Sequence, residues 1–177
     1  DGCHDIQADI GRGGEPLIPH VERLVNRGSA ISVHEYWQLN RKKWALQQAY
    51  LEKWKRLRSP ATGRPADIVI LPPMPHTSFP HGGCRWVGYT KIWNLLDYSA
   101  LVIPAGKVAA EDRDAEWGFA ARNETDEWNQ GLWEKHKEEM VRMELPVGLQ
   151  IVARKLEEEK VLAAGAVIED VLRARSC

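Results

Sequence analysis

Pro146-Val147-Gly148-Leu149-Gln150-Ile151-Val152 is a nearly continuous apolar run near the C-terminal end of this 177-residue chain. A short run that is apolar on both faces is typical of a strand inside a sheet that helices cover above and below. Residues 67–71 and 100–103 form two similar runs, and each is followed by proline. Because proline cannot continue the ladder of a central strand, each run is predicted to be a short strand that feeds a loop.

Helices are predicted between and after these strands, over residues 89–96 and about 126–143 and after residue 156. The last helix is marked by Glu157, Glu158 and Glu159, since carboxylates stabilise the positive end of the helix dipole. Strands that alternate with helices predict an α/β fold class, with helices covering both faces of the sheet.

The N-terminal part is predicted to be helical. Ser32 followed by Glu35 is a capping box, and residues 33–57 contain neither Gly nor Pro, which predicts one long helix. Its apolar residues recur at steps of three, four or seven and so share one stripe: Tyr36, Leu39, Leu46, Tyr50, Trp54 and Leu57. A shorter helix is predicted over residues 16–26, and residues 11–14 (GRGG) are predicted to be a flexible turn.

Composition limits the class of protein. With 44% hydrophobic residues, the chain has enough apolar material for one core. Its net charge of -1 creates no overall electrostatic field that would attract nucleic acid or an anionic membrane. Trp44 and Trp54 lie among basic residues and could stack on bases, but an amphipathic helix whose lysine stems cover apolar surface explains the pattern better, so no nucleic-acid partner is predicted. The apolar runs are far too short to span a bilayer, which predicts a soluble protein without a membrane partner.

Cysteine usage and motifs indicate no disulfide framework, metal or cofactor. Cys3, Cys84 and Cys177 are few and scattered, and no basic-then-apolar leader follows Asp1, so a reducing, cytoplasmic location is expected. His76, His81 and Cys84 match no standard zinc spacing, and the acidic residues 111–116 lack the order of a calcium loop. Nucleotide, zinc-protease and hydrolase-elbow motifs are absent from the sequence.

Three segments together resemble the amidase signature family, in particular its fungal acetamidase-like members. They are residues 145–162, which include LPVGLQIVAR, residues 89–104 (YTKIWNLLDYSALVIP), and residues 67–73 leading to PHGG at 80–83. Residues 14–16 and 35–40 are also like the fungal subgroup, so the resemblance covers almost the whole chain. Ser99 stands where that subgroup usually has proline, and Ala153 where it usually has glycine.

The resemblance implies that residues 1–177 are a single partial domain, the C-terminal part of the amidase signature fold with its mixed sheet. Members of the family hydrolyse carboxamides with a serine, a second serine in a cis peptide and a lysine, in a Gly- and Ser-rich segment. This chain contains no such segment. It is therefore expected to hold no catalytic residue and to be inactive alone, with a small-molecule amide as the substrate of the complete enzyme.

The same resemblance, with the rule that ligands gather at strand ends, gives candidate residues for an amide pocket. These are Met74, His76, Trp93, Asn94 and Asp97. The alternative is a non-catalytic binding or interaction module derived from the amidase fold.

An incomplete sheet should leave an unpaired strand edge beside an apolar patch. The expected partners are then the missing N-terminal amidase portion or a second copy of the chain. The competing expectation is that the helix over residues 33–57 folds back over the gap and gives a stable monomer.

Overall fold

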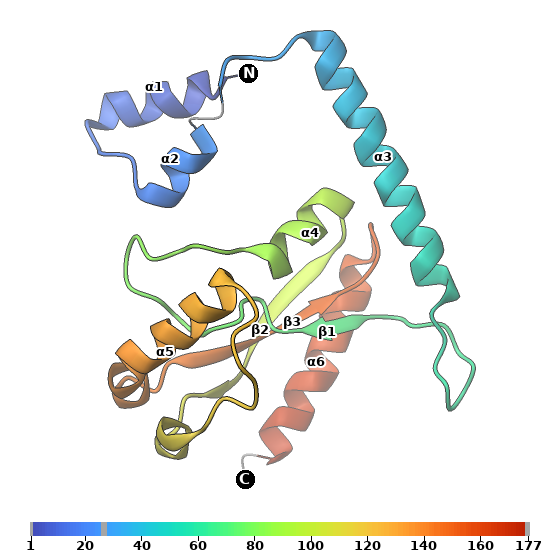
Figure 1. The fold of residues 1–177 in the computed structure, drawn as a ribbon. Helices are drawn as coiled ribbons and strands as arrows, with labels where there is room; N and C mark the ends of the chain where they lie inside the picture. Colours follow the sequence, from blue (N-terminus) through green and yellow to red (C-terminus); the bar gives the residue numbers. More distant parts are fainter. Residues whose placement is uncertain (1, 26–27, 176–177) are drawn as a thin grey trace.

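The computed structural model describes residues 2–25 and 28–175, and its centre is a three-stranded sheet (Figure 1). The strands are β1 (Val69–Leu71), β2 (Ala100–Lys107) and β3 (Pro146–Val152), in the order β1-β3-β2. Both outer strands run antiparallel to β3, with Ile70 opposite Ile151 and Leu101 opposite the same residue. The predicted α/β class is confirmed. Parallel pairing, which a mixed sheet also needs, does not occur among the described strands.

One face of the sheet is covered by α6 (Glu158–Arg175). Ile151, Ala153 and Val161 are buried there and pack against Leu101 and other partly buried apolar residues. A Cβ on Gly165 would lie 2.5 Å from Cδ2 of Leu101, so α6 approaches β2 more closely than a residue with a side chain would allow without a shift.

The opposite face is covered by α4 (Gly88–Leu96) and by the C-terminal end of α3 (Val33–Arg56). Trp54, Trp93, Leu96 and Val152 form the buried cluster between them. Gln150 is a buried polar residue on this face, and its Nε2 donates to the carbonyl oxygen of Tyr89 at 3.0 Å, which meets its hydrogen-bonding need.

Helices therefore lie on both faces, as predicted, but the cover is incomplete. Ile70 in β1 and Val102 in β2 are half exposed, on opposite faces of the sheet. β1 and β2 each pair on one side only, which leaves two strand edges open among the described residues.

The long helix α3 begins as the sequence predicts. The Ser32 hydroxyl accepts the Glu35 backbone N–H at 3.2 Å, and the Glu35 carboxylate accepts the Ser32 backbone N–H at 2.8 Å. Only the C-terminal half of α3 packs on the sheet, through Tyr50 and Trp54. The N-terminal half carries exposed Tyr36 and Leu39, so the helix does not fold back along its whole apolar stripe.

The first 25 residues differ from the prediction. α1 (His4–Gly13) includes Gly11 and Gly13, so the predicted flexible turn over residues 11–14 is wrong apart from Gly14. Gly14 has φ 65° and its N–H bonds to the Ile10 carbonyl, an αL stop that glycine adopts without strain. The next helix, α2 (Pro19–Val25), is shorter than predicted, and the predicted end at Asn26 lies outside the described residues.

A third apolar cluster lies beside the sheet, where α5 (Glu124–Arg142) packs with the residues around the short helix η1 (Ala110–Asp114). Val108, Leu132 and Met140 are its buried members. Arg113 in η1 pairs with Glu138 in α5 at 3.1 Å. Within the described ranges, no helix is long and apolar enough to cross a bilayer.

Candidate functional site

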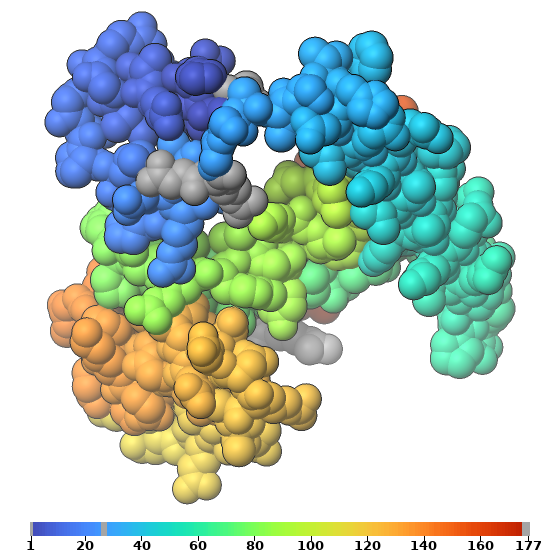
Figure 2. Space-filling view, turned by 45° about the horizontal axis from the view of Figure 1, so that its top comes forward, coloured from blue at the N-terminus to red at the C-terminus, as the bar shows by residue number. Residues whose placement is uncertain are grey.

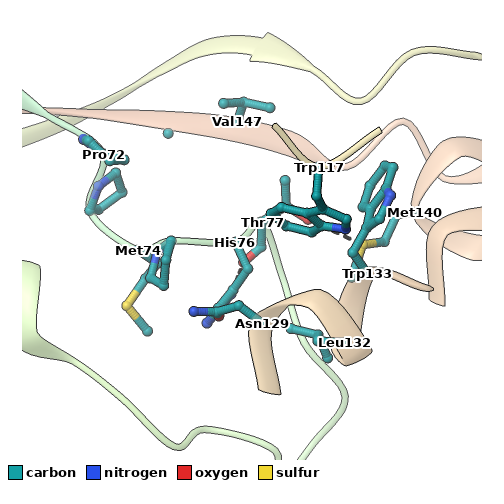
Figure 3. A pocket seen from close by; sticks show the side chains of 13 residues that line it. Pro72, Met74, His76, Thr77, Trp117, Asn129, Leu132, Trp133, Met140 and Val147 are labelled. Atoms are coloured by element: carbon teal, nitrogen blue, oxygen red, sulfur yellow. Dashed lines mark hydrogen bonds between the residues drawn. The ribbon is translucent and has the colours of Figure 1, made fainter. Parts of the chain in front are cut away.

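A pocket of about 330 Å³ lies where the chain leaves β1 (Figure 3). The segment from Pro72 to Thr77 forms one wall, and its three prolines restrict the backbone because each ring fixes φ. Since β1 runs antiparallel to β3, this segment lies beside the first half of β3, and Val147 and Gly148 complete the wall. A Cβ on Gly148 would lie 2.9 Å from Cγ of Pro73, so glycine permits this close approach.

The opposite wall comes from α5. Asn129, Leu132, Trp133 and Met140 recur at steps of three, one and seven, which places them on one face of that helix. Trp117, from the segment after η1, closes the pocket beside Trp133, as Figure 3 shows. The volume lies at the lower end of the range that is typical of small-molecule pockets, and the lining is mostly apolar.

The lining residues with polar side-chain atoms are His76, Thr77 and Asn129, together with Trp117 and Trp133 through their indole N–H groups. The Nδ1 atom of His76 lies 2.8 Å from the carbonyl oxygen of Thr77, and the Thr77 hydroxyl donates to the Met140 sulfur at 3.6 Å. The rings of Phe79 and Trp128 pack edge-on against the His76 ring, with ring centroids 5.1 and 5.2 Å from the His76 centroid. Such contacts fix the orientation of the imidazole.

The structure divides the five predicted pocket residues into two groups. Met74 and His76 line the pocket. Trp93 is buried in the cluster on the sheet, stacked on Tyr98 with centroids 6.1 Å apart. Asn94 donates to the Thr90 carbonyl at 3.4 Å within α4, and Asp97 forms an ion pair with Lys155, which lowers the pKa of that carboxyl. Trp93, Asn94 and Asp97 therefore do not belong to the lining of this pocket.

Sequence reasoning missed Trp117, Asn129 and Trp133 as pocket residues. The helix that carries Asn129 and Trp133 was predicted. Its sequence, which has tryptophan at both 128 and 133, does not indicate which face of the helix contacts the proline-rich segment. A pocket formed between segments about 50 residues apart depends on tertiary packing, which local patterns do not report.

The described ranges hold no group of three or more His, Cys, Asp or Glu residues that could bind a metal ion. His81 lines a separate surface pocket with His136 and Glu139, while Cys177 lies outside the described residues.

A cluster of charged side chains lies at the other end of β3, in the turn to α6. The Arg154 guanidinium donates to the Glu157 carboxylate at 2.6 and 3.1 Å, the Arg154 backbone N–H donates at 3.1 Å, and Lys160 donates at 2.8 Å. These bonds, those of the Arg154 side chain foremost, lower the pKa of Glu157 from its ordinary 4.5 to about 2.

This cluster makes the free energy of unfolding depend on pH in the acid range. Because the pKa of Glu157 is lower in the folded chain than in the unfolded chain, its stabilisation is present above pH 4.5 and is lost as the pH falls toward 2. We expect a loss of about 1–3 kcal/mol in the free energy of unfolding across that window. Urea unfolding at several pH values measures it. Arg154→Leu should flatten the dependence, while Arg173→Leu, which removes an exposed ion pair with Glu169 in α6, should leave it unchanged.

Comparison with known proteins agrees with this architecture. The sequence profile of the Amidase family matches residues 10–162. "Amidase 2" of Gibberella moniliformis is 52% identical over 91% of this chain, and the match covers 31% of that protein. "Acetamidase" of Emericella nidulans is 32% identical over 97% of this chain and 31% of that protein.

A solved structure, "Fatty acid amide hydrolase", has the same fold over 97% of this chain and 30% of its own, with a TM-score of 0.71 and 24% identity. The chain thus spans about a third of the length of the relatives that it matches. The family match over most of the sequence, on an α/β scaffold with a pocket beside the central strand, leads to one conclusion: the chain belongs to the amidase family.

Proposed function

We propose that this chain is the substrate-binding third of an amidase that hydrolyses the carbon–nitrogen bond of carboxamides. The observation that carries the proposal is the match to proteins named amidase and acetamidase over more than nine-tenths of this chain. Because the match covers only about 31% of those proteins, the serine and lysine chemistry is assigned to the part of the enzyme that these 177 residues do not include.

The chain's own contribution is the pocket beside β3. Its walls of proline, tryptophan and methionine exclude water from the organic group of a substrate and strengthen the polar contacts made there. We propose Met74 and His76 as substrate contacts, with Trp117 and Trp133 as the aromatic wall. Trp93 is proposed to support the scaffold, because it is buried in the cluster with Trp54 and does not line this pocket.

The partner that the proposal requires is the upstream portion of the enzyme. It would pair with the open edges of β1 and β2 and cover the exposed apolar residues of α3, so that residues 1–177 form one partial domain of the complete protein. A cytoplasmic location is proposed from the low cysteine content, since secreted domains of this size usually carry more.

The function is tested by joining the two parts. We expect the purified 177-residue chain to release no ammonia from a panel of carboxamides, because a nucleophile, its base and its oxyanion donors act as a unit. A chimera in which this chain replaces the matching third of "Amidase 2" should hydrolyse them at least about 1,000-fold faster than the chain alone.

The control is the same chimera with its upstream nucleophilic serine changed to alanine, which should be inactive. Turnover by the isolated chain that survives repurification and disappears on replacing Ser78 or Ser99 would contradict the proposal that the catalytic residues lie outside these 177 residues.

A non-catalytic interaction module is the second candidate. The exposed aromatic residues on α3 favour it, since such residues often mark a protein interface. An inactive chimera that folds normally would favour this candidate over the amidase.

A further inference from the structure

Another pocket lies on α5 and has a basic lining. Its volume is about 390 Å³, and it is enclosed between the turn at residues 80–85 and one face of the helix. The residues that α5 contributes recur at steps of three and one: Trp128, Gly131, Leu132, Lys135 and His136. Arg85 and Lys135 bring two positive charges, while the lining that the structure describes contains no carboxylate. We call this site the basic pocket.

Arg85 is placed at one end of the basic pocket by an aromatic ring. Its guanidinium carbon lies 5.9 Å from the centroid of the Trp128 ring, which is a cation–π contact. The side chain is exposed, so its N–H groups remain available to two oxygens of an oxyanion. The loop wall is a tight turn, in which the Gly83 N–H donates to the Pro80 carbonyl oxygen at 2.9 Å.

Lys135 approaches the same space from the other end. Helical side chains lean toward the N-terminus of their helix, so the Lys135 stem should lie over the turn that contains Gly131, four residues earlier. Gly131 has no side chain, and a Cβ built on it would meet no atom within 4 Å. The space between Arg85 and Lys135 is therefore open to a ligand, with Leu132 beside it.

The carboxylates of α5 do not neutralise this pocket. Those around Lys135 are paired with other cations: Glu134 with Lys137, Glu138 with Arg113, and Glu139 with Arg142. Neither Arg85 nor Lys135 forms an ion pair with any residue in the ranges 2–25 and 28–175. Two cations that share one concave site without a counter-charge attract an anion.

We propose that the basic pocket binds a phosphate group, either free or carried by a small molecule. The Arg85 guanidinium donates to two of its oxygens, the Lys135 ammonium to a third, and His136 supplies a further donor. A dianion is preferred to a carboxylate because it carries charge for both cations. The basic pocket shares Leu132 with the first pocket but none of that pocket's polar side chains, so this inference does not depend on the proposed function.

The test is a binding measurement on the 177-residue chain at about pH 8, where a phosphate monoester carries nearly two negative charges. The probes are phenyl phosphate, benzoate and inorganic phosphate. Calorimetry or ligand-observed NMR should show phenyl phosphate binding about tenfold more tightly than benzoate. Inorganic phosphate separates the two sources: affinity equal to that of phenyl phosphate identifies free phosphate as the ligand, and weaker affinity identifies a phosphorylated small molecule.

Charge variants assign the binding to this pocket. Arg85→Gln and Lys135→Gln should each weaken phenyl phosphate binding by about tenfold. Lys91→Gln is the matched control, because it removes the same charge from an exposed lysine of α4 that does not line the pocket, and it should change nothing.

A second pair of variants changes the pocket from within. Gly131→Glu places a carboxylate four residues before Lys135, where the two side chains can pair. Gly131→Gln adds a similar volume without the charge. Both replace a glycine inside a helix with a better helix former, so neither should unfold the chain, as circular dichroism melts will show. Binding of phenyl phosphate should be at least about tenfold weaker in Gly131→Glu than in Gly131→Gln.

Four results would each overturn the proposal. The first two are benzoate binding as tightly as phenyl phosphate and no phosphate binding up to the solubility limit of the probes. The third is unchanged affinity in folded Arg85→Gln and Lys135→Gln. The fourth is an equal loss in Lys91→Gln, since binding would then follow the overall charge of the chain rather than this pocket.

Discussion

Replacing Trp54 with alanine is expected to lower the free energy of unfolding by about 3–5 kcal/mol. Trp54 is 2% exposed and is the main side chain that joins α3 to the sheet. Its ring packs edge-on against Tyr98 at 5.5 Å, and its Nε1 donates to the carbonyl oxygen of Ala66 at 3.0 Å. Truncation leaves a large cavity and an unpaired carbonyl, against a total stability of about 5–15 kcal/mol for a typical domain.

Urea unfolding followed by circular dichroism measures the effect, and α3 supplies a matched control. Trp44 lies on the same helix and is 64% exposed, so Trp44→Ala should change the free energy of unfolding by no more than about 0.5 kcal/mol. Trp54→Phe keeps most of the buried area but loses the hydrogen bond. Its loss in the free energy of unfolding should lie between those of Trp44→Ala and Trp54→Ala. Similar losses for Trp44→Ala and Trp54→Ala would show that α3 is not held by the buried end of its stripe.

The sequence predicted the scaffold well where local chemistry determines it. The capping box at Ser32 set the start of α3, and the run from Pro146 to Val152 was predicted with both ends correct. β2 was predicted to stop at Pro104 but continues to Lys107. The reason is that β2 is an edge strand: proline lacks only an N–H there, and a register shift between Pro104 and Gly106 absorbs the irregularity.

The candidate site was only partly predictable. A proline-rich segment after a strand indicated a loop that could form a pocket wall, and it led to Met74 and His76. The prediction that Trp93 lines an amide pocket rests on the resemblance and on the rule that ligands gather at strand ends, whereas the structure places Trp93 in the core cluster and outside the lining of this pocket. Its burial against Tyr50 and Tyr98 depends on where α3 crosses α4, which the periodicity of either helix does not reveal.

The second large effect concerns the surface of the isolated chain. Tyr36, Trp37, Leu39, Trp44 and Leu46 are each more than half exposed on the part of α3 that precedes Tyr50, and Figure 2 shows this helix on an outer face of the molecule. A soluble monomer rarely exposes so many large apolar side chains on one helix. Together with the open edges of β1 and β2, they present a surface suited to a partner.

We therefore expect the 177-residue chain alone to bind a hydrophobic dye strongly and to sediment faster as its concentration rises. The chimera with the upstream part of "Amidase 2" should do neither, because the proposed partner then covers α3 and the strand edges. Trp37→Gln combined with Trp44→Gln should reduce dye binding several-fold in the isolated chain, whereas Lys42→Gln, an exposed polar change on the same helix, should not.

A monodisperse monomer that unfolds in one cooperative transition and binds no dye would contradict the incomplete-domain interpretation. In that case the surface of α3 would be a tolerated feature of an independent module, since exposed aromatic residues that drive neither association nor dye binding require no missing partner.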